Sequence, residues 1–478
     1  MTKLNELTLS EAAHGLRAHT FSVRELWDAC AAAALARNQE LNAFLELFAA
    51  EEAAISAAQK RIDTEGEAAP LLCGIPLAIK DNILIEGKIA SAASKMLENH
   101  RATYDATVIR KLKEAGALFL GRTNMDEFAL GGSTENSAFG PTKNPHDSTR
   151  VAGGTSGGSA AAVAAHLCIA ALGTDTGGSV RNPASFCGVV GLKPTYGAVS
   201  RSGVIAAASS FDQVGSIAKS VQDAQLLFEA IRGKDALDAT SIAEDSSAAR
   251  PVREKLVVGV LRGLLSRGGI DEGVRNAFEA TLAQLADAGH EIRDIDIPAA
   301  EPALAAYYII NFAEVSTNLA RYDGIRYGRA SRGETLLEDY VRARTEGFGK
   351  ETRRRILLGT FVLSSGYIDA YYHQASAARA ELRRQFEGAF ASVDVIATPT
   401  MPTPAFALGE KSDPLAMYLE DIFTVTANLT GMPALSVPMG FVERVGKQLP
   451  VGMHFTAPHQ AEHTLFALAA TVEKLRGS

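Results

Sequence analysis

The stretch GGTSGGSA, residues 153 to 160, sets two neighbouring hydroxyls, Thr155 and Ser156, between two pairs of glycines. A second turn, TDTGGSVR at 174 to 181, sets Ser179 behind another glycine pair. Glycine loses more backbone freedom on folding than any other residue, so two such turns indicate a site shaped by backbone. Successive N–H groups in such a turn can converge on one point, as in an oxyanion hole. The residues that precede Ser179 in this turn are Thr176, Gly177 and Gly178.

The apolar stretch CGIPLAIKDNILI, residues 73 to 85, predicts a buried strand with Lys80 within it or at its end. Burying an ammonium group is costly unless the group is paired or loses its proton. These residues alone leave two interpretations open. Either Lys80 reaches the surface or pairs with Asp81, or it is a desolvated amine that can act as a base.

Two neighbouring patterns have other interpretations. GTSGG at 154 to 158 matches the G-x-S-x-G nucleophile elbow of α/β-hydrolases, which would make Ser156 the nucleophile and require an aspartate and a histidine further along the chain. Nothing in the sequence distinguishes one of the candidate histidines, which are His290, His373 and His454. Asp175 and Arg181 flank Ser179, and we expect them to form a structural ion pair.

The rest of the chain alternates helical and strand patterns. The first 60 residues are helical in pattern, with capping boxes at Thr8 to Glu11 and Ser22 to Glu25. Helix, glycine and strand follow one another at 106–125 and 159–178. Longer helices are expected at 303–325, 334–346 and 351–389, and a strand pair at 433–441 and 449–456.

This alternation predicts an α/β fold in one continuous domain. Within the single domain, residues 1–478, we expect N-terminal helices over 1–60, a core over about 65–225, and the remainder of the same domain over 226–478.

Composition limits the function classes. The net charge of -8 argues against a protein that grips a phosphate backbone by itself. No apolar run reaches the length of about 18 residues that a membrane span needs, and the N-terminus resembles neither a signal peptide nor a transit peptide. The four cysteines form no C-x-x-C pair and the histidines show no zinc spacing, so we expect reduced thiols, a cytoplasmic location and no metal site.

Lys80, GGTSGGSA and TDTGGSVR together resemble the amidase signature family. The resemblance implies a central mixed β-sheet covered by helices on both faces, and a triad of base, bridging hydroxyl and nucleophile. Ser179 would be the nucleophile, Lys80 the base, and Thr155, 24 positions before Ser179, the bridging residue in a cis peptide. The family has serine at the bridging position, and threonine is more restricted at χ1. The N–H groups of Thr176, Gly177, Gly178 and Ser179 would form the oxyanion hole.

Longer stretches, among them GRTNMDEFALGGSTENSAFGPTKNP and GFGKETRRRILLGTFVLSSGYIDAYY, resemble the A subunits of the glutamyl-tRNA(Gln)/aspartyl-tRNA(Asn) amidotransferases. This resemblance implies a glutaminase within a heterotrimer. The ammonia would pass to a B subunit, which uses ATP and Mg²⁺ and holds most of the mischarged tRNA, while a small C subunit joins A and B. This chain would need no metal or organic cofactor, and it contains no P-loop motif.

Free glutamine carries an α-carboxylate and an α-ammonium, so its pocket needs a fixed cation and a fixed anion. By resemblance Arg355 would hold the carboxylate, Asp421 the ammonium, and Tyr307 would wall the pocket. The residues alone leave open that Arg353, Arg354 and Arg355 form a solvated helix face. Two other functions also stay open, namely a stand-alone amidase for a small amide and a non-catalytic binding subunit in which Thr155 marks a lost triad.

Overall fold

A mixed β-sheet runs through the protein, of which the computed structural model describes residues 3–243, 253–266 and 269–477. Eleven strands of these residues lie in the order β1-β3-β2-β6-β8-β7-β12-β13-β11-β9-β10. Their bounds are β1 (Phe44–Leu47), β2 (Pro76–Lys80), β3 (Leu118–Thr123), β6 (Ala170–Asp175), β7 (Val190–Lys193), β8 (Gln213–Ala218), β9 (Val257–Leu261), β10 (Glu291–Ile295), β11 (Val395–Pro399), β12 (Ala434–Arg444) and β13 (Lys447–Thr456). A separate two-stranded sheet pairs β4 (Lys143–Asn144) with β5 (Asp147–Val151).

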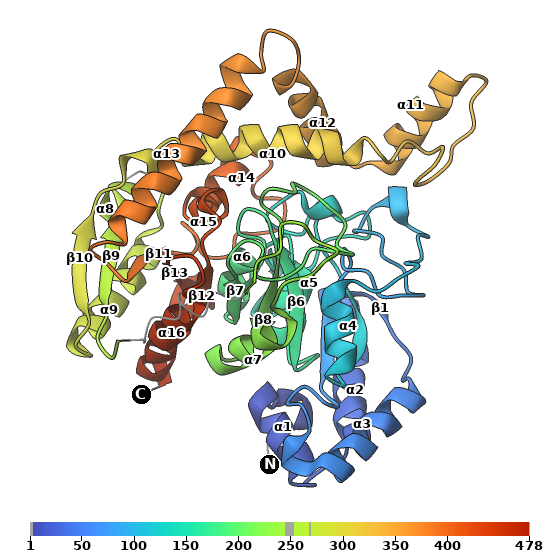
Figure 1. Cartoon of the computed structure of the whole chain (residues 1–478), viewed down its shortest axis with the longest axis vertical. Coiled ribbons are helices and arrows are strands. Elements are labelled where there is room, and N and C mark those ends of the chain that lie inside the picture. The colour runs from blue at the N-terminus through green and yellow to red at the C-terminus, as the bar shows by residue number, and fades with distance from the viewer. Residues whose placement is uncertain (1–2, 244–252, 267–268, 478) are drawn as a thin grey trace.

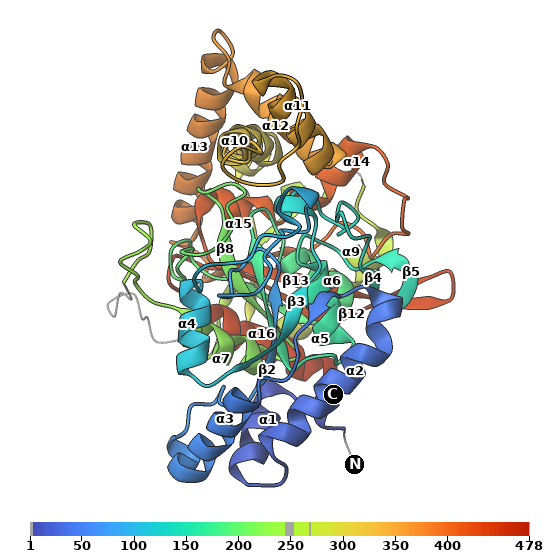
Figure 2. The same cartoon turned by 90° about the vertical axis from the view of Figure 1, so that its right-hand side faces the viewer.

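Helices cover both faces of this sheet, as the amidase-type fold predicts (Figure 1). They are α1 (Leu9–Arg17), α2 (Val23–Leu41), α3 (Glu52–Glu65), α4 (Thr107–Glu114), α5 (Gly157–Ala164), α6 (Arg181–Cys187), α7 (Val221–Ile231), α8 (Arg262–Leu265), α9 (Glu272–Asp287), α10 (Ala303–Leu319), α11 (Leu336–Gly347), α12 (Lys350–Val362), α13 (Gln374–Ala389), α14 (Pro414–Tyr418), α15 (Val425–Thr430) and α16 (Glu462–Gly477). The helices α5 and α6 pack on the sheet and on each other, as do α7 and α16. A further layer, the helical cap of α10 to α13, lies over one edge of the sheet (Figure 2).

Most of the expected elements are present. Both capping boxes form, at Thr8 with Glu11 and at Ser22 with Glu25. The pattern over the first 60 residues missed the short strand β1, and the helix expected over 351–389 is interrupted. After α12 ends at Val362, the chain turns through Gly366, whose φ of +86° favours glycine, and resumes in α13.

Parallel pairing brings the two glycine turns to one edge of the sheet. The strand β2 pairs in parallel with β6, so the ends of both strands face the same way. Lys80 is the last residue of β2, and Asp175 is the last residue of β6. The helix α5 begins at Gly157, directly after Thr155 and Ser156, and so delivers their hydroxyls to the same edge.

No helix among the described residues is long and apolar enough to cross a membrane. The same part of the chain contains no cluster of three or more histidine, cysteine or acidic side chains that could hold a metal ion. Its four cysteines are buried and free.

Gly359 sets the distance between α12 and α10 in the helical cap. A Cβ at this position would lie 1.9 Å from the carbonyl oxygen of Phe312 in α10, which is far inside van der Waals contact. We expect Gly359→Ala to force the helices apart, destabilise the protein by about 1–3 kcal/mol, and lower its melting temperature. Gly388→Ala in α13 is the matched control, because a Cβ there meets nothing within 4 Å. An unchanged melting temperature for Gly359→Ala would contradict this packing.

Candidate active site

Lys80 is fully buried, and hydroxyls surround its amine. The Nζ atom lies 2.7 Å from Thr155 Oγ1 and 2.8 Å from Ser156 Oγ, and 3.3 Å from the carbonyl oxygen of Thr174. The side chain therefore does not reach the surface. The two hydroxyls of the GGTSGGSA turn and a carbonyl oxygen near the end of β6 are the polar groups that contact the amine.

Asp81, the other partner considered for Lys80, is engaged elsewhere. Its carboxylate pairs with Arg122 at 2.8 Å, and it accepts hydrogen bonds from Ser91 and from the Ala93 N–H. Lys80 thus has no direct carboxylate partner among the described residues.

Burial lowers the pKa of Lys80 to about 7, against the opposing effect of the charges of Asp126, Asp175 and Asp212. A lysine with this pKa is partly neutral at neutral pH and can accept a proton. The desolvated-base interpretation of Lys80 therefore agrees with both its contacts and its environment.

The glycines of the first turn let it pack against neighbouring polar groups. The peptide bond between Gly154 and Thr155 is cis, as the family resemblance implies. A Cβ on Gly154 would lie 2.3 Å from Asp126 Oδ2, and one on Gly158 would lie 2.4 Å from the carbonyl oxygen of Ala43. Any larger residue at either position would displace the turn that holds Thr155 against Lys80.

The second turn leaves the side chain of Ser179 nearly buried. Ser179 is 7% exposed, and its hydroxyl forms no hydrogen bond with any described residue. Thr155 Oγ1 is bonded to Lys80, but no hydrogen bond joins it to Ser179 in the described part of the chain. Only the Lys80 side of the expected relay is therefore formed in this structure, and a relay requires the Ser179 hydroxyl to turn toward Thr155.

One of the expected oxyanion donors is already used. The N–H of Gly178 donates to Asp175 Oδ1 at 2.9 Å, because the Asp175 carboxylate closes the turn. This corrects the expectation for Gly178. The N–H groups of Thr176, Gly177 and Ser179 have no acceptor among the described residues, and so they are the donors that a developing oxyanion can use.

The predicted ion pair of Asp175 and Arg181 is confirmed. It is fully buried and bidentate, with Nη2 to Oδ1 at 2.9 Å and Nε to Oδ2 at 3.0 Å, and the guanidinium holds the pKa of Asp175 well below its usual range. His454 Nε2 contacts Arg181 at 2.8 Å. Ser156 contacts Lys80 and the Thr174 backbone, and no described histidine bonds to it, so the elbow hypothesis for Ser156 is not supported.

The helix α12 buries one of its three consecutive arginines. Arg354 is exposed, whereas Arg355 is only 3% exposed and donates to Glu351 Oε1 at 2.8 Å. Tyr418 also donates to Glu351, at 2.8 Å. The solvated-face interpretation thus fails for Arg355. The sequence analysis missed Glu351, although its spacing of four residues before Arg355 is typical of a helical ion pair.

Asp421 lies near Arg355, because both contact the same side chain, Tyr308. Tyr308, which the sequence analysis also missed, donates to Asp421 Oδ2 at 2.6 Å. The ring of Tyr308 lies 5.5 Å from the Arg355 guanidinium. Burial raises the pKa of Asp421 to about 7, although the Tyr308 hydrogen bond and the Arg355 charge lower it.

Two sets of contacts connect this wall to the turn before Ser179. Tyr307 fills the space beside Gly177, where a Cβ would lie 2.3 Å from its hydroxyl oxygen. Asn311 links Tyr307, at 3.4 Å, to Arg355, at 3.3 Å. On the Asp421 side, Thr424 donates to the Gly177 carbonyl at 2.6 Å. The arrangement therefore places Arg355, which is paired with Glu351, and the separate acid Asp421 beside the Ser179 turn.

The site contains a buried lysine, a cis peptide bond and a serine behind two glycines, as the family resemblance implies. The family model described as "Amidase" matches residues 25–466 of the chain. The chain belongs to the amidase family. It is 50% identical over 445 residues, 92% of each chain, to the A subunit of the glutamyl-tRNA(Gln) amidotransferase of Koribacter versatilis (strain Ellin345).

Solved structures agree with this placement. The crystal structure of the A subunit of the glutamyl-tRNA(Gln) amidotransferase from Thermotoga maritima is 40% identical, with a TM-score of 0.81, over 99% of this chain and 96% of that one. A structure described as a vestigial protein complex that reveals the evolutionary origins of an s-triazine catabolic enzyme is 32% identical, with a TM-score of 0.86, over 98% and 99%. Because the fold matches both about equally, the distinction between them depends on sequence identity, 40% against 32%.

The geometry leads us to expect that Ser179, and not Ser156, is the reactive serine. A fluorophosphonate probe should label the protein, Ser179→Ala should abolish labelling, and Ser156→Ala should retain a measurable part of it. Labelling is read from the modified peptide by mass spectrometry. A probe attached to Ser156 in the unmodified protein would overturn the assignment.

Proposed function

We propose that the protein is the glutamine-hydrolysing component of a tRNA-dependent amidotransferase. It would release ammonia from glutamine for conversion of Glu-tRNA(Gln), Asp-tRNA(Asn) or both to the amidated aminoacyl-tRNAs. Partner B and C subunits would complete the heterotrimer in the cytoplasm, with ATP and Mg²⁺ bound by the B subunit. The names of the most similar relatives support this proposal, since they are A subunits of such an enzyme.

The presence of both Arg355 and Asp421 beside the turn that carries Ser179 supports the substrate assignment. A guanidinium offers paired donors to the α-carboxylate of glutamine, and a carboxylate suits its α-ammonium. Tyr308 bonds to Asp421 and packs near Arg355, so the separation of the two charges is set by one rigid ring. An amidase for apolar amides would have no use for both charges.

In the proposed acylation step, neutral Lys80 accepts a proton from the Ser179 hydroxyl through the hydroxyl of Thr155. The Ser179 oxygen attacks the side-chain amide carbon of glutamine, and the carbonyl oxygen becomes an oxyanion. The free N–H groups of Thr176, Gly177 and Ser179 would stabilise this charge, and loss of one such donor typically costs about 3–4 kcal/mol.

The tetrahedral intermediate collapses when the proton on Lys80 returns through Thr155 to the leaving nitrogen, which departs as ammonia. A glutamyl ester of Ser179 remains. Water attacks this ester, Lys80 takes the proton of the water, and glutamate leaves as Ser179 regains its hydrogen. Every proton transfer in this cycle involves Lys80, so no bound metal or organic cofactor is required of this chain.

The charge pair provides the experiment that tests the proposed function. Ammonia release from glutamine should fall strongly in Arg355→Ala, with a higher KM, because loss of a charged partner costs about 2–5 kcal/mol. Lys350→Ala is the matched control, since Lys350 is an exposed cation on the same helix, whereas Arg354 shares the Glu351 carboxylate with Arg355. If the unmodified protein, with its partner subunits, hydrolysed a simple aliphatic amide better than glutamine, a stand-alone amidase would replace this proposal.

The bridging role of Thr155 depends on its hydroxyl. Thr155→Ser should stay within roughly tenfold of the unmodified rate, a barrier change of about 1.4 kcal/mol. Thr155→Val keeps the shape but removes the hydroxyl, and it should lose about 10²–10⁴-fold in kcat, as for removal of an acid–base group. If Thr155→Val stayed active while Ser156→Ala failed, the relay would pass through Ser156, which contacts the same amine.

Glutamine affinity should depend on the charge of Asp421. Its carboxylate must be ionised to hold the ammonium, and its pKa of about 7 means that ionisation is completed as the pH rises through neutrality. We expect the Kd for glutamine, measured by calorimetry on the inactive Ser179→Ala variant, to fall roughly tenfold between about pH 6 and pH 8. Asp421→Asn should bind weakly at both pH values, and a flat Kd in the unmodified pocket would contradict the role of Asp421.

A further inference from the structure

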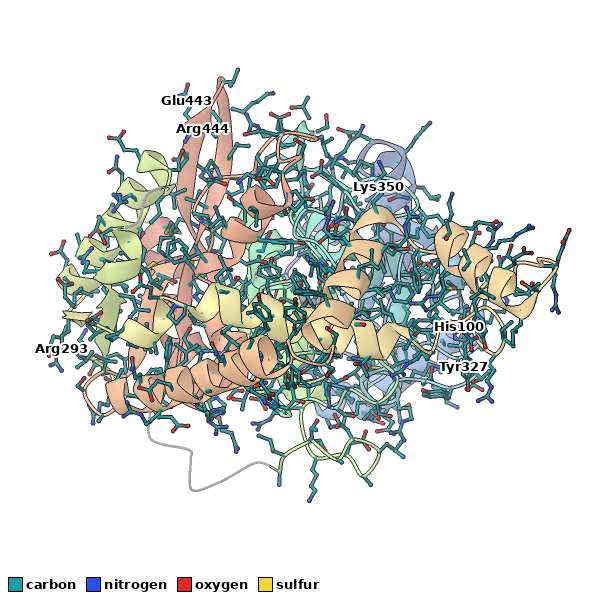
Figure 3. All side chains as sticks on the ribbon, turned by 90° about the horizontal axis from the view of Figure 1, so that it is seen from above. His100, Arg293, Tyr327, Lys350, Glu443 and Arg444 are labelled. Carbon is teal, nitrogen blue, oxygen red and sulfur yellow. The ribbon has the colours of Figure 1, made fainter. Side chains whose placement is uncertain are left out.

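A groove of about 290 Å³ lies between α11 and α12 of the helical cap. Tyr340, Val341 and Phe348 line it from α11 and its end, and Ile356 and Leu357 line it from α12. Figure 1 shows α11 and α12 standing away from the sheet, and Figure 3 looks down on this layer, with Lys350 at the beginning of α12. The groove is therefore on the outside of the molecule, apart from the sheet core.

Large apolar side chains around this groove are exposed to solvent. Of the residues that line the groove, Val341 is 56% exposed and Leu357 70%, and in the first turn of α11 Leu336 is 61% exposed and Leu337 72%. Exposed apolar residues scattered singly are ordinary, but a group of them beside a groove marks an interaction site. Leu357 also belongs to the stretch GFGKETRRRILLGTFVLSSGYIDAYY, and it has no role in the reaction proposed above.

Two arginines give the groove a charge. Arg344 and Arg353 both line it, and neither forms an ion pair with a carboxylate among the described residues. Arg344 is held in place by the carbonyl oxygens of Leu319, at 3.1 Å, and Tyr322, at 2.9 Å. An occupant with apolar side chains and a nearby carboxylate would complement both the walls and the two guanidiniums.

We propose that this groove docks an acidic, amphipathic segment of a partner chain of the amidotransferase. The inference rests on the proposed function, which makes this chain one component of a larger enzyme. Apolar side chains of the segment would fill the space between Val341 and Leu357, and its carboxylates would pair with Arg344 and Arg353. Helix-in-groove recognition of this kind uses apolar anchors at spacings of three and four residues.

The position of the groove relates docking to the glutamine pocket. Arg353 and Leu357 line the groove, while Glu351 and Arg355 on the same helix are buried against Tyr418 and Asn311, where glutamine is proposed to bind. One face of α12 would thus contact the docked segment, and the other would contact glutamine. Substitutions on the groove face can weaken docking without removing a group that touches glutamine.

The test is the affinity of the full chain for the B and C subunits of the same organism, purified as a pair and measured by biolayer interferometry. Val341→Asp, Leu357→Asp and Arg353→Glu should each weaken binding by roughly tenfold or more, as for an anchor at the centre of an interface. Leu35→Asp is the matched control, because Leu35 is also an exposed leucine, at 71%, but lies on α2. It should change the affinity by less than about twofold.

Equal melting temperatures of the variants and the unmodified chain would exclude unfolding as the cause of weaker binding. Arg353→Glu serves as a second variant, because it does not place a charge in the apolar wall of the groove. The inference is overturned if the groove variants bind the B and C subunits as the control does, or if the unmodified chain does not bind them. It is also overturned if the variants change only self-association in sedimentation, since the occupant would then be a second copy. Ammonia release from glutamine by the free chain is measured separately, so failure of the groove and failure of the proposed function give different results.

Discussion

The buried amine of Lys80 imposes the constraint on which the rest of the site depends. An ammonium at this depth is unfavourable, and no carboxylate among the described residues contacts the amine directly. Hydroxyls and a carbonyl oxygen surround it instead, which permits a neutral amine near neutral pH. The parallel pairing of β2 with β6, the cis peptide and the close-packed glycines together bring those hydroxyls to the amine.

A second buried charge fixes the neighbouring turn. Asp175 and Arg181 satisfy each other at the end of β6, and Asp175 also takes the Gly178 N–H. Asp175 also accepts from the Val180 N–H, whereas the N–H groups of Gly177 and Ser179, on either side of Gly178, have no acceptor among the described residues. The turn is thus held by an ion pair that has no acid–base role in the proposed reaction. The proposed base, Lys80, lies at the end of the neighbouring strand β2.

Much of this could be predicted from the sequence, because the signals were local. The apolar run that ends in Lys80 and the two glycine turns are visible without knowledge of distant contacts. The roles expected for Thr155, Ser179, Arg355 and Asp421 come instead from the resemblance to the amidase family, because the residues alone leave them open. Tyr308 and Glu351 could not be found in this way, since they matter only once α10, α12 and the segment around Asp421 have packed together. The engagement of Gly178 and the break after Val362 also follow from tertiary contacts and backbone conformation, which composition and periodicity do not report.

The central claim is that the buried Lys80 amine loses its proton near neutral pH, and this amine is the group to measure. Lysine labelled with ¹³C and ¹⁵N at the side chain, with the Lys80 signal identified by its loss in Lys80→Met, allows a direct titration by NMR. The account predicts a pKa of about 7 for this amine, well below the usual 10.5. A Lys80 that stays protonated up to about pH 10, the range of an unperturbed lysine, would contradict it.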